Sequence, residues 1–509
     1  MAAFPDRSIC RAAKVVYPTT EEELILAVAN ATMANTKMKV ATRTSHSIPK
    51  LVCPEGDNGL LISTKYLNRT LDVNVSSMTM TVESGMTLRE LINDAAEAKL
   101  ALPYAPYWWG LTIGGMMGTA EEGYAKVRTL EIGNPELNAA KVSLGVLGVI
   151  SQVTFKLQPM FKRSVTYITK NDSDFGAEAI SFGRKHEYAD FMWYPSQKQV
   201  VYRIDDRVPS NTSGNGLLDF PGFRSTASLV VSGLRTTEET EESQGDANGK
   251  CINGKATTFT LKTMAFGLTN NGILFTGYPV VGYHNRLQAS GTCLDSLEDL
   301  TITACPWDHR VKGLFFHQTT FSISLSKVKN FIEDVQKLVA LEPKSMCVLD
   351  LYNGILIRYV TASTAYLGKQ EDALDFDITY YRSKDPMSPR LYEDILEEIE
   401  QIAMFKYGAL PHWGKNRNLA FDGVINKYKS GIEFLKVKAK YDPLGLFSSS
   451  WTDQILGLNG VETVDKEGCA LEGLCICSQD IHCAPKKNYF CRPGKVYRDA
   501  RVCTSVYTN

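Results

Sequence analysis

Half of the 12 cysteines of this 509-residue chain lie in its last 41 residues. So dense a cluster is typical of a small module that lacks an adequate apolar core and is held together by disulfides. A zinc site would favour C-x2-C pairs, whereas the successive gaps here are 5, 1, 5, 7 and 11 residues. Disulfides are the favoured interpretation of residues 460–509, zinc is the alternative, and the spacing leaves the pairing open. The six cysteines are Cys469, Cys475, Cys477, Cys483, Cys491 and Cys503.

The rest of the chain is too long for one core, so two or three domains are expected in all. Hydrophobic residues make up 44% and charged residues 22%, which is ordinary for a globular protein. A net charge of −1 gives no electrostatic footprint for nucleic acid or an anionic membrane. No apolar run approaches the roughly 20 residues of a membrane-spanning helix, so no transmembrane segment is predicted.

Disulfides require an oxidising compartment, which predicts the secretory pathway, the vacuole or the extracellular space and cell wall. The opening "MAAFPDRSIC" lacks the apolar stretch of a signal peptide. We interpret this beginning as a processed or incomplete amino terminus. Five N-x-[ST] sequons agree with a secreted glycoprotein, although a chain of this size contains several by chance. They are Asn30, Asn68, Asn74, Asn171 and Asn211.

Residues 10–158 alternate between strand and helix patterns. "KMKVAT", "NGLLIST" and the alternating "SMTMTVES" indicate strands. Capping boxes from Thr20 to Glu23 and from Thr87 to Glu90 each indicate the start of a helix. The segment predicts an α+β or α/β domain that binds a ligand at its loops.

Residues 159–455 show a different pattern, in which strand-like "SVTYIT", "VVYRID", "MCVLDLY" and "ILIRYVT" are interleaved with amphipathic helices. The clearest helix is "SPRLYEDILEEIEQIAMFKYG", with Ser388 as its cap and Pro389 in its first turn. The polar run 236–250 is predicted to be an exposed loop. The apolar face of the clear helix consists of Leu391, Ile395, Ile399 and Ile402.

His46, in "RTSHSIPK", lies between two predicted strands. Its imidazole is a candidate nucleophile, metal ligand or cofactor anchor, and a solvated loop histidine is the plain alternative. His412 and Lys415 flank Trp413 in "LPHWGKNRN", a combination that suits proton transfer or stabilisation of a developing anion. The alternative there is a helix end decorated with cations that complement its dipole.

Glycines are dense in "GGMMGTAEEGYAKV", at Gly114, Gly115 and Gly118. Glycine lets backbone amides approach a phosphate or a flat ring, and a tight turn packed by aromatic residues is the alternative. Glu121 and Glu122 follow at once, and two carboxylates near a pyrophosphate oppose its binding unless they point to solvent. A second pair, Gly145 and Gly148 in "SLGVLGVIS", is weak evidence by itself.

Together, His46-Ser47, Gly114-Gly115, "LGVLGVI", His-Trp-Gly-Lys and "YDPLGLFSSSW" resemble the vanillyl-alcohol-oxidase superfamily. Within it they resemble the aldonolactone oxidases, and most of all the plant L-gulonolactone oxidases, which carry a similar cysteine-rich tail. The resemblance covers nearly the whole chain. It implies an α+β fold with an FAD-binding domain at 10–158, a cap or substrate domain at 159–455 and a disulfide module at 460–509.

The resemblance also implies site residues. Lys415 stabilises negative charge on the flavin, while His412 and Arg358 hold a sugar lactone. His46 matches the position of covalent attachment in members with covalent flavin. The other FAD-lining positions are Ser47, Gly114, Gly115, Gly118, Gly145, Gly148 and Ile150.

The implied reaction is hydride transfer from an aldonolactone carbinol to FAD, giving a 2-keto lactone that tautomerises to ascorbate. Oxygen or another acceptor then reoxidises the flavin. L-gulono-1,4-lactone is the expected type of substrate, with D-arabinono-1,4-lactone oxidase activity alongside. Two alternatives stay open: a catalytically impaired secreted family member, and a flavin oxidase of another sugar or alcohol.

Three departures from the family pattern accompany the resemblance. The loop before His46 reads "ATRTS", where the family has glycines. The acid-x-basic motif of the cap reads "LIR", so that Arg358 is kept and Leu356 stands at the acidic position. After Thr119, a glycine-, histidine- and serine-rich loop and a strand are predicted to be missing.

Overall fold

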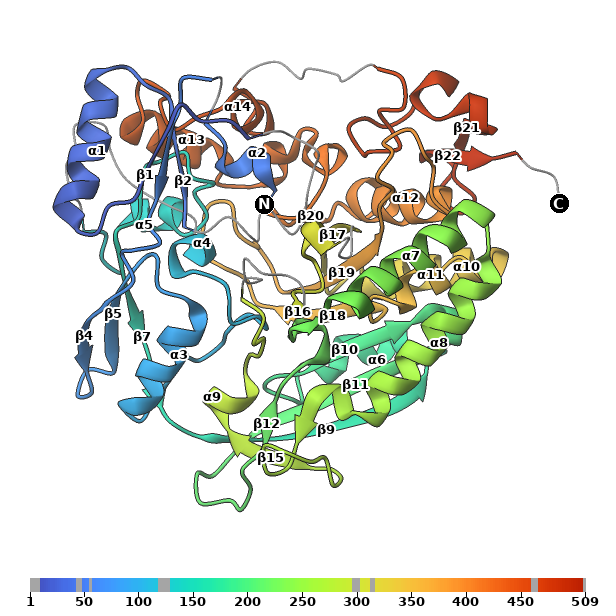
Figure 1. Ribbon diagram of the computed structural model, residues 1–509, viewed down its shortest axis with the longest axis horizontal. Helices are drawn as coiled ribbons and strands as arrows, with labels where there is room; N and C mark the ends of the chain where they lie inside the picture. Colours follow the sequence, from blue (N-terminus) through green and yellow to red (C-terminus); the bar gives the residue numbers. More distant parts are fainter. Residues whose placement is uncertain are drawn as a thin grey trace.

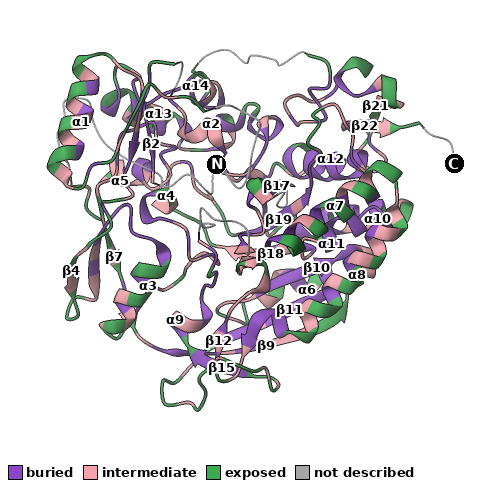
Figure 2. Ribbon diagram, viewed as in Figure 1, coloured by how far each residue is buried: buried purple, intermediate pink, exposed green. Residues whose placement is uncertain are grey.

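The protein consists of two mixed α and β bodies side by side, with a small disulfide-rich module against one of them (Figure 1). The computed structural model describes residues 10–42, 48–54, 57–117, 129–294, 303–311, 316–458 and 466–506. The central sheet of the larger body is buried, whereas the outer faces of helices such as α1 and α7 are largely exposed (Figure 2). The α+β fold class is confirmed.

The amino-terminal body begins with a parallel sheet of order β1 (Lys14–Val16), β3 (Leu60–Ser63), β2 (Met38–Ala41). Helix α1 (Glu21–Met33) packs Leu24 and Val28 against it. Thr20 caps this helix by accepting from the Glu23 amide, as predicted. The Glu23 carboxylate, however, bonds Thr19 instead of completing the predicted box at Thr20.

A second, antiparallel sheet has the order β4 (Thr70–Asn74), β5 (Thr79–Glu83), β7 (Gln152–Lys156). Helix α3 (Leu88–Glu97) contributes buried leucine and isoleucine side chains to the core shared with this sheet. Its capping box between Thr87 and Glu90 is confirmed, with both reciprocal bonds formed.

The larger body is built on an eight-stranded antiparallel sheet of order β15-β9-β11-β10-β18-β19-β17-β20. The predicted strands "SVTYIT", "VVYRID" and "ILIRYVT" are confirmed as parts of β9, β11 and β18. Helices α6 (Phe175–Phe182), α10 (Val328–Leu341) and α12 (Glu393–Gln401) share the main core with one face of the sheet. The strands are β15 (Val280–Tyr283), β9 (Lys162–Asn171), β11 (Gln199–Val208), β10 (Asp190–Tyr194), β18 (Ile355–Val360), β19 (Ala373–Tyr381), β17 (Phe316–Ser324) and β20 (Leu410–Pro411).

Two predicted elements of this body are wrong. "MCVLDLY" contains the helix α11 (Cys347–Asp350) instead of a strand, because a short buried apolar run has no periodicity that separates the two. The polar run 236–250 is not a loop but parts of α7 (Ser228–Gln244) and α8 (Ala247–Thr263). The inner stripe of these helices is ionic, with buried Arg235, Glu238 and Lys250, so an apolar period gives no signal.

The clearest predicted helix exists, but it begins at Glu393 instead of beside Ser388. Ser388 donates to the Asp385 carboxylate, and Tyr392 has a left-handed φ of 56°, which separates Pro389 from the helix. The helix continues into a π-helical turn, Ile402–Lys406. The predicted face is confirmed for Ile395, Ile399 and Ile402, which are buried, and Leu391 packs against the same core.

After the larger body, the chain returns to the amino-terminal one. Helices α13 (Gly431–Tyr441) and α14 (Ser450–Ile455) lie beside β1 and β2 (Figure 1). The Met38 amide donates to the Leu446 carbonyl, and Tyr441 donates to the Glu136 carboxylate. The amino-terminal body is therefore built from both ends of the 10–455 segment.

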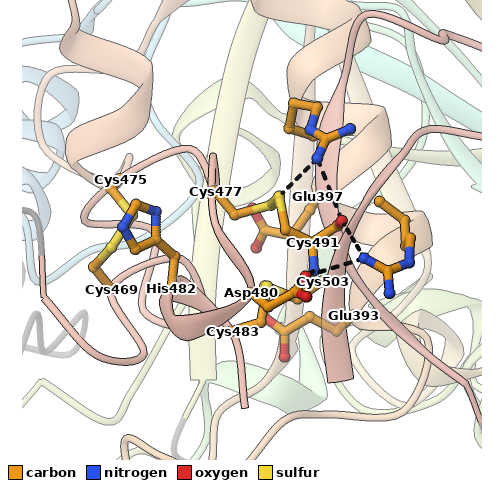
Figure 3. Close-up of a disulfide and its surroundings, with 12 residues drawn as sticks. Glu393, Glu397, Cys469, Cys475, Cys477, Asp480, His482, Cys483, Cys491 and Cys503 are labelled. Atoms are coloured by element: carbon orange, nitrogen blue, oxygen red, sulfur yellow. Dashed lines mark hydrogen bonds and ion pairs between the residues drawn. A yellow bond between two sulfur atoms is a disulfide. The ribbon is translucent and has the colours of Figure 1, made fainter. Parts of the chain in front are cut away.

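The carboxy-terminal module is held by three disulfides, Cys469–Cys475, Cys477–Cys491 and Cys483–Cys503 (Figure 3). The predicted disulfides are confirmed, and three more bridges lie elsewhere in the described chain. The hairpin β21 (Tyr489–Pro493) and β22 (Arg501–Ser505) packs on α12. There the buried Glu398 carboxylate accepts from the amides of residues 495–497 at 2.6–2.7 Å.

Candidate active site

The polar face of the eight-stranded sheet carries the candidate site. Along β18, Ile355 and Ile357 enter the main core, so Leu356 and Arg358 point to the opposite face. Strand β19 pairs Asp377 with Leu356 and Asp375 with Arg358. Directly paired residues share a face of a sheet. Two carboxylates therefore lie beside the Arg358 guanidinium.

The His-Trp-Gly-Lys segment joins this face because β20 pairs with β17. The His412 amide donates to the Thr320 carbonyl at 3.0 Å, and Asn416 Oδ1 accepts from the same amide at 3.0 Å. The Trp413 ring is buried, stacks on Phe421 and donates through Nε1 to a carbonyl. This anchored indole holds His412 and Lys415 on either side of it.

Lys415 and Arg358 meet on one carboxylate. Lys415 Nζ lies 2.6 Å from Asp377 Oδ2, and Arg358 Nη2 lies 3.5 Å from the same oxygen. The side chain of Asp377 is 7% exposed, that of Lys415 17% and that of Arg358 25%. Lys415 therefore has a specific partner across the sheet. The structure does not support the alternative of a lysine that decorates a helix end.

Burial and charge set the protonation of this cluster. Burial lowers the pKa of Lys415, and Asp377 partly offsets that effect. Burial also disfavours the charged form of Asp377, but Lys415 and Arg358 outweigh it and lower the pKa of this carboxyl. The Asp377 carboxylate, shared by Lys415 and Arg358, thus favours the charged forms of both partners.

His412 is neutral at neutral pH. Burial, followed by the charges of Lys415 and Lys369, lowers its pKa to about 3. The Gly414 amide donates to its Nδ1 at 3.1 Å, so the proton of the neutral ring lies on Nε2. The imidazole is thus a hydrogen-bond donor to a ligand oxygen and a weak base.

Four polar residues near Arg358 escaped the sequence analysis: Tyr107, Asp190, Asp375 and Asp377. The Tyr107 hydroxyl donates to Asp190 Oδ2 at 2.6 Å, and the Arg358 guanidinium lies 5.6 Å from the centre of the Tyr107 ring. The alternation of "LDFDITYY" placed both carboxylates of β19 on one face, and that signal was available. No motif around Tyr107 predicted its place at the site, because Tyr107 belongs to the amino-terminal body and its partner Asp190 to the larger one.

Gly114 and Gly115 lie in α4 (Ile113–Met117), where backbone and hydroxyls crowd together. The Gly114 amide donates to the Ser84 carbonyl at 2.6 Å, and a Cβ on Gly114 would lie 3.0 Å from side-chain carbons of Ser84 and Thr42. The Thr42 and Thr112 hydroxyls bond each other. Ser84 Oγ is buried without a hydrogen-bond partner in the described part of the chain.

Gly145 and Gly148 have φ values of 66° and 142°, a region in which side chains are strained. The segment between these glycines packs in the same cluster as Trp413, and Ile150 lies against that cluster. The glycine segment and the His-Trp-Gly-Lys segment therefore share a core. His46, Ser47 and Gly118 lie outside the described residues, as do Glu121 and Glu122.

These residues fit FAD. A phosphate or a flat ring would meet a close, polar surface here. It is formed by hydroxyls at the ends of β2 and β5, including the buried Ser84 Oγ that has no partner in the described chain, and by glycines at which an added Cβ would crowd its neighbours. When bound, FAD supplies the acceptor for two electrons. Gly114, Gly115, Gly145 and Gly148 would hold it.

Three family models match the chain. "FAD binding domain" matches residues 12–130, "D-arabinono-1,4-lactone oxidase" residues 310–455 and "L-gulonolactone oxidase 2-like, C-terminal domain" residues 466–505. Probable L-gulonolactone oxidase 6 and L-gulonolactone oxidase 2 of Arabidopsis thaliana are each 64% identical to the chain. The alignments cover 99% of this chain and 88% and 90% of the relatives, respectively. The chain belongs to the plant L-gulonolactone oxidase family. It is an FAD-dependent oxidoreductase of that family.

More distant likenesses agree with the fold. The L-gulonolactone oxidase of Bos taurus is 23% identical over 86% of this chain and 94% of its own. A solvent-stable cholesterol oxidase superposes with a TM-score of 0.64 at 14% identity, covering 87% of this chain and 94% of its own. The Bermuda grass isoallergen BG60 superposes with a TM-score of 0.52 at 11% identity, covering 86% and 89%.

The chain is shorter than its family members within the matched region. The alignment with the first relative runs over 532 positions, whereas this chain has 509 residues, so at least 23 positions of the relative have no counterpart here. The alignment with L-gulonolactone oxidase 2 runs over 534 positions. A deletion of this order agrees with the predicted loss after Thr119, whose place in the chain stays a prediction.

Proposed function

We propose that this family member oxidises an aldonolactone of the L-gulono-1,4-lactone type and thereby serves ascorbate formation. Oxygen or another acceptor takes the electrons from FAD. The observation that carries the proposal is the half-buried cluster of Lys415, Arg358 and Asp377 beside His412, on a sheet face next to the FAD-binding body. The names of the relatives supply the class of substrate.

In the proposed reaction, a carbinol carbon gives up a hydride, for which bound FAD would be the acceptor, and the carbinol hydroxyl gives up its proton to solvent. His412 Nε2–H donates to a lactone oxygen, and Arg358 provides a second cationic donor for the ring oxygens. The Lys415 ammonium would stabilise the negative charge that the flavin gains when it accepts the hydride. The Trp413 anchor keeps His412 and Lys415 in a fixed relation, so that little reorganisation is needed during the reaction.

A substrate panel tests this proposal. Purified protein loaded with FAD is offered L-gulono-1,4-lactone, D-arabinono-1,4-lactone, other sugars and simple alcohols, while flavin bleaching is followed without oxygen. Bleaching by the aldonolactones and formation of ascorbate from the gulono form are the expected results. Bleaching by another sugar or alcohol alone would assign the chain to the alternative flavin oxidase.

The deletion of at least 23 positions supports a second candidate, a family member with impaired turnover. In that case the protein retains FAD weakly and no lactone bleaches it. FAD content after gel filtration, compared with that of a full-length relative prepared in parallel, separates the candidates.

Passage through the secretory pathway is also part of the proposal. The asparagines of all five sequons are exposed in the structure. In the part of the chain that the structure describes, no helix has the length and apolarity to cross a bilayer. Expression in plant cells, followed by glycosidase digestion and a mobility assay, tests this proposal. A chain that is unglycosylated and retained in the cytosol would contradict it.

A further inference from the structure

Leu356 of the candidate site has an aspartate as its paired residue on the neighbouring strand. Strand β18 pairs Leu356 with Asp377 of β19. Directly paired residues in antiparallel strands have Cβ atoms about 5 Å apart on one face. A carboxylate that starts from Asp377 therefore reaches the same space as one that would start from position 356. Leu356 itself packs against an apolar cluster of Met192, Tyr194, Val201 and Phe266.

Asp377 contacts both cations of the site. Its Oδ2 accepts from Lys415 Nζ at 2.6 Å and lies 3.5 Å from Arg358 Nη2. Its Oδ1 accepts from the side-chain amide of Gln318. With three donors converging on it, this carboxylate has one orientation, and it fixes the ammonium and the guanidinium relative to each other.

The neighbouring carboxylate has different partners. Asp375 Oδ1 accepts from the Ser322 hydroxyl and lies 3.9 Å from Lys369 Nζ. Asp190 is bonded by Tyr107 and Arg203. Among the described residues, Asp377 is the one carboxylate in contact with Lys415.

We propose that Asp377 is the positioning residue that holds Lys415 and Arg358 for the reaction. The inference deepens the proposed function and depends on it for the reaction. The contact between Asp377 and Lys415 can be measured without turnover.

The first test measures the reactivity of Lys415 toward acetic anhydride, by peptide mass spectrometry between pH 6 and 10 on the FAD-loaded protein. The groups that act on Lys415 are Asp377, Arg358, Asp375 and His412, and Lys369 lies beside Asp375. Asp377→Asn removes the carboxylate and leaves the cations, so the ammonium loses its proton at lower pH. We expect at least about tenfold faster labelling at pH 7, which corresponds to one pKa unit. Unchanged labelling overturns the proposal.

The second test moves the carboxylate across the strand pair. Asp377→Asn is expected to lower kcat about 10²-fold with a smaller change in KM, and adding Leu356→Glu is expected to restore part of kcat and the slow labelling. Asp377→Glu keeps a carboxylate at position 377, and it replaces the double variant in this test if the double variant does not fold. An Asp377→Glu variant that behaves like Asp377→Asn, or a folded double variant that recovers neither property, overturns the proposal.

Asp205→Asn is the matched control, because it removes another buried carboxylate of the same sheet that pairs with Arg163 and Arg203. It measures what such a loss does to unfolding temperature. If Asp377→Asn and Asp205→Asn lose the same share of kcat for the same decrease in unfolding temperature, the role of Asp377 is structural and the proposal is overturned. If the wild-type protein oxidises no aldonolactone, the proposed function fails, and the labelling still decides whether Asp377 holds Lys415.

Discussion

Lys415 shows how a single residue combines anchoring and chemistry. Its side chain is half-buried near Arg358, and Asp377, 2.6 Å away, favours its charged form. We predict that Lys415→Met lowers kcat about 10²- to 10³-fold, because the developing negative charge loses its nearest cation. Stopped-flow reduction of the flavin measures this loss. FAD content is expected to stay at the wild-type level.

Lys436→Met is the control for Lys415, since Lys436 is exposed on α13 and pairs only with Glu433 in the described structure. It is expected to leave kcat unchanged. A Lys415→Met protein with wild-type kcat would remove the ammonium from the reaction.

His284 connects the two bodies and makes stability depend on pH. Its Nε2 donates to the Leu102 carbonyl at 2.8 Å, and Arg163 approaches its Nδ1 at 3.4 Å. Burial, and next the charge of Arg163, lowers its pKa from 6.5 to about 3. Between these values the unfolded chain binds a proton that the folded protein does not, so the free energy of unfolding falls as the pH drops from 6.5 toward 3.

We predict that His284→Gln makes the free energy of unfolding depend less on pH below pH 6.5. Glutamine can still donate to Leu102 and accept from Arg163, but it does not titrate. The slope between pH 6 and 4 is expected to fall by about 1.4 kcal/mol per pH unit. Urea unfolding at a series of pH values measures it, and an unchanged slope would show that His284 is already protonated in the folded protein.

At the scale of elements, helix α12 joins the site to the disulfide module. Its buried Glu397 and Glu400 hold Arg417, and Glu400 also accepts from the Thr319 hydroxyl. Between these two residues in sequence, Glu398 accepts from three consecutive amides of the module. The helix therefore links the module to the segment that follows Lys415.

Glu398→Ala is predicted to lower the free energy of unfolding by about 3 kcal/mol, because three amide donors lose a charged acceptor. Thermal unfolding measures this change, and limited proteolysis shows whether the hairpin of β21 and β22 is released first. Glu467→Ala, at an exposed position of the same module, is the control. Equal unfolding temperatures for the two variants would contradict the prediction.

At the scale of the whole molecule, the FAD-binding body is assembled from distant parts of the chain, and the chain has at least 23 positions fewer than the relative it matches. We predict that inserting the matching segment of L-gulonolactone oxidase 2 between Thr119 and Glu121 tightens FAD binding at least about tenfold. The insertion is expected to restore contacts to the cofactor and to place Glu121 and Glu122 further along the chain from Gly114 and Gly115. Equilibrium dialysis against FAD measures the change.

Insertion of a glycine–serine segment of equal length is the control for this prediction. It restores spacing without the family's side chains. If both insertions act alike, length alone accounts for the effect. If neither alters FAD binding, the deletion lies elsewhere or does not concern the cofactor.

Local chemistry made part of this fold predictable. The Thr87 box, the alternation of β5 and the cysteine spacing each act within a few residues, so they identified the α3 start, a strand and the disulfide module. The ionic stripe of α7 and α8 was missed because it has no apolar period. The late start of α12 was missed because the left-handed φ of Tyr392 leaves no sign in the apolar pattern. The predicted residues Lys415, His412 and Arg358 do lie on one sheet face.

The sequence by itself determined the family, the FAD-binding class, the disulfide tail and the residues worth testing, because motifs and spacings are short-range properties. Only the tertiary structure decided which carboxylate forms the ion pair with Lys415. Asp377 follows its paired residue, Leu356, 21 residues later on a neighbouring strand. Antiparallel register brings the two positions face to face, and no pattern in the linear chain sets that register.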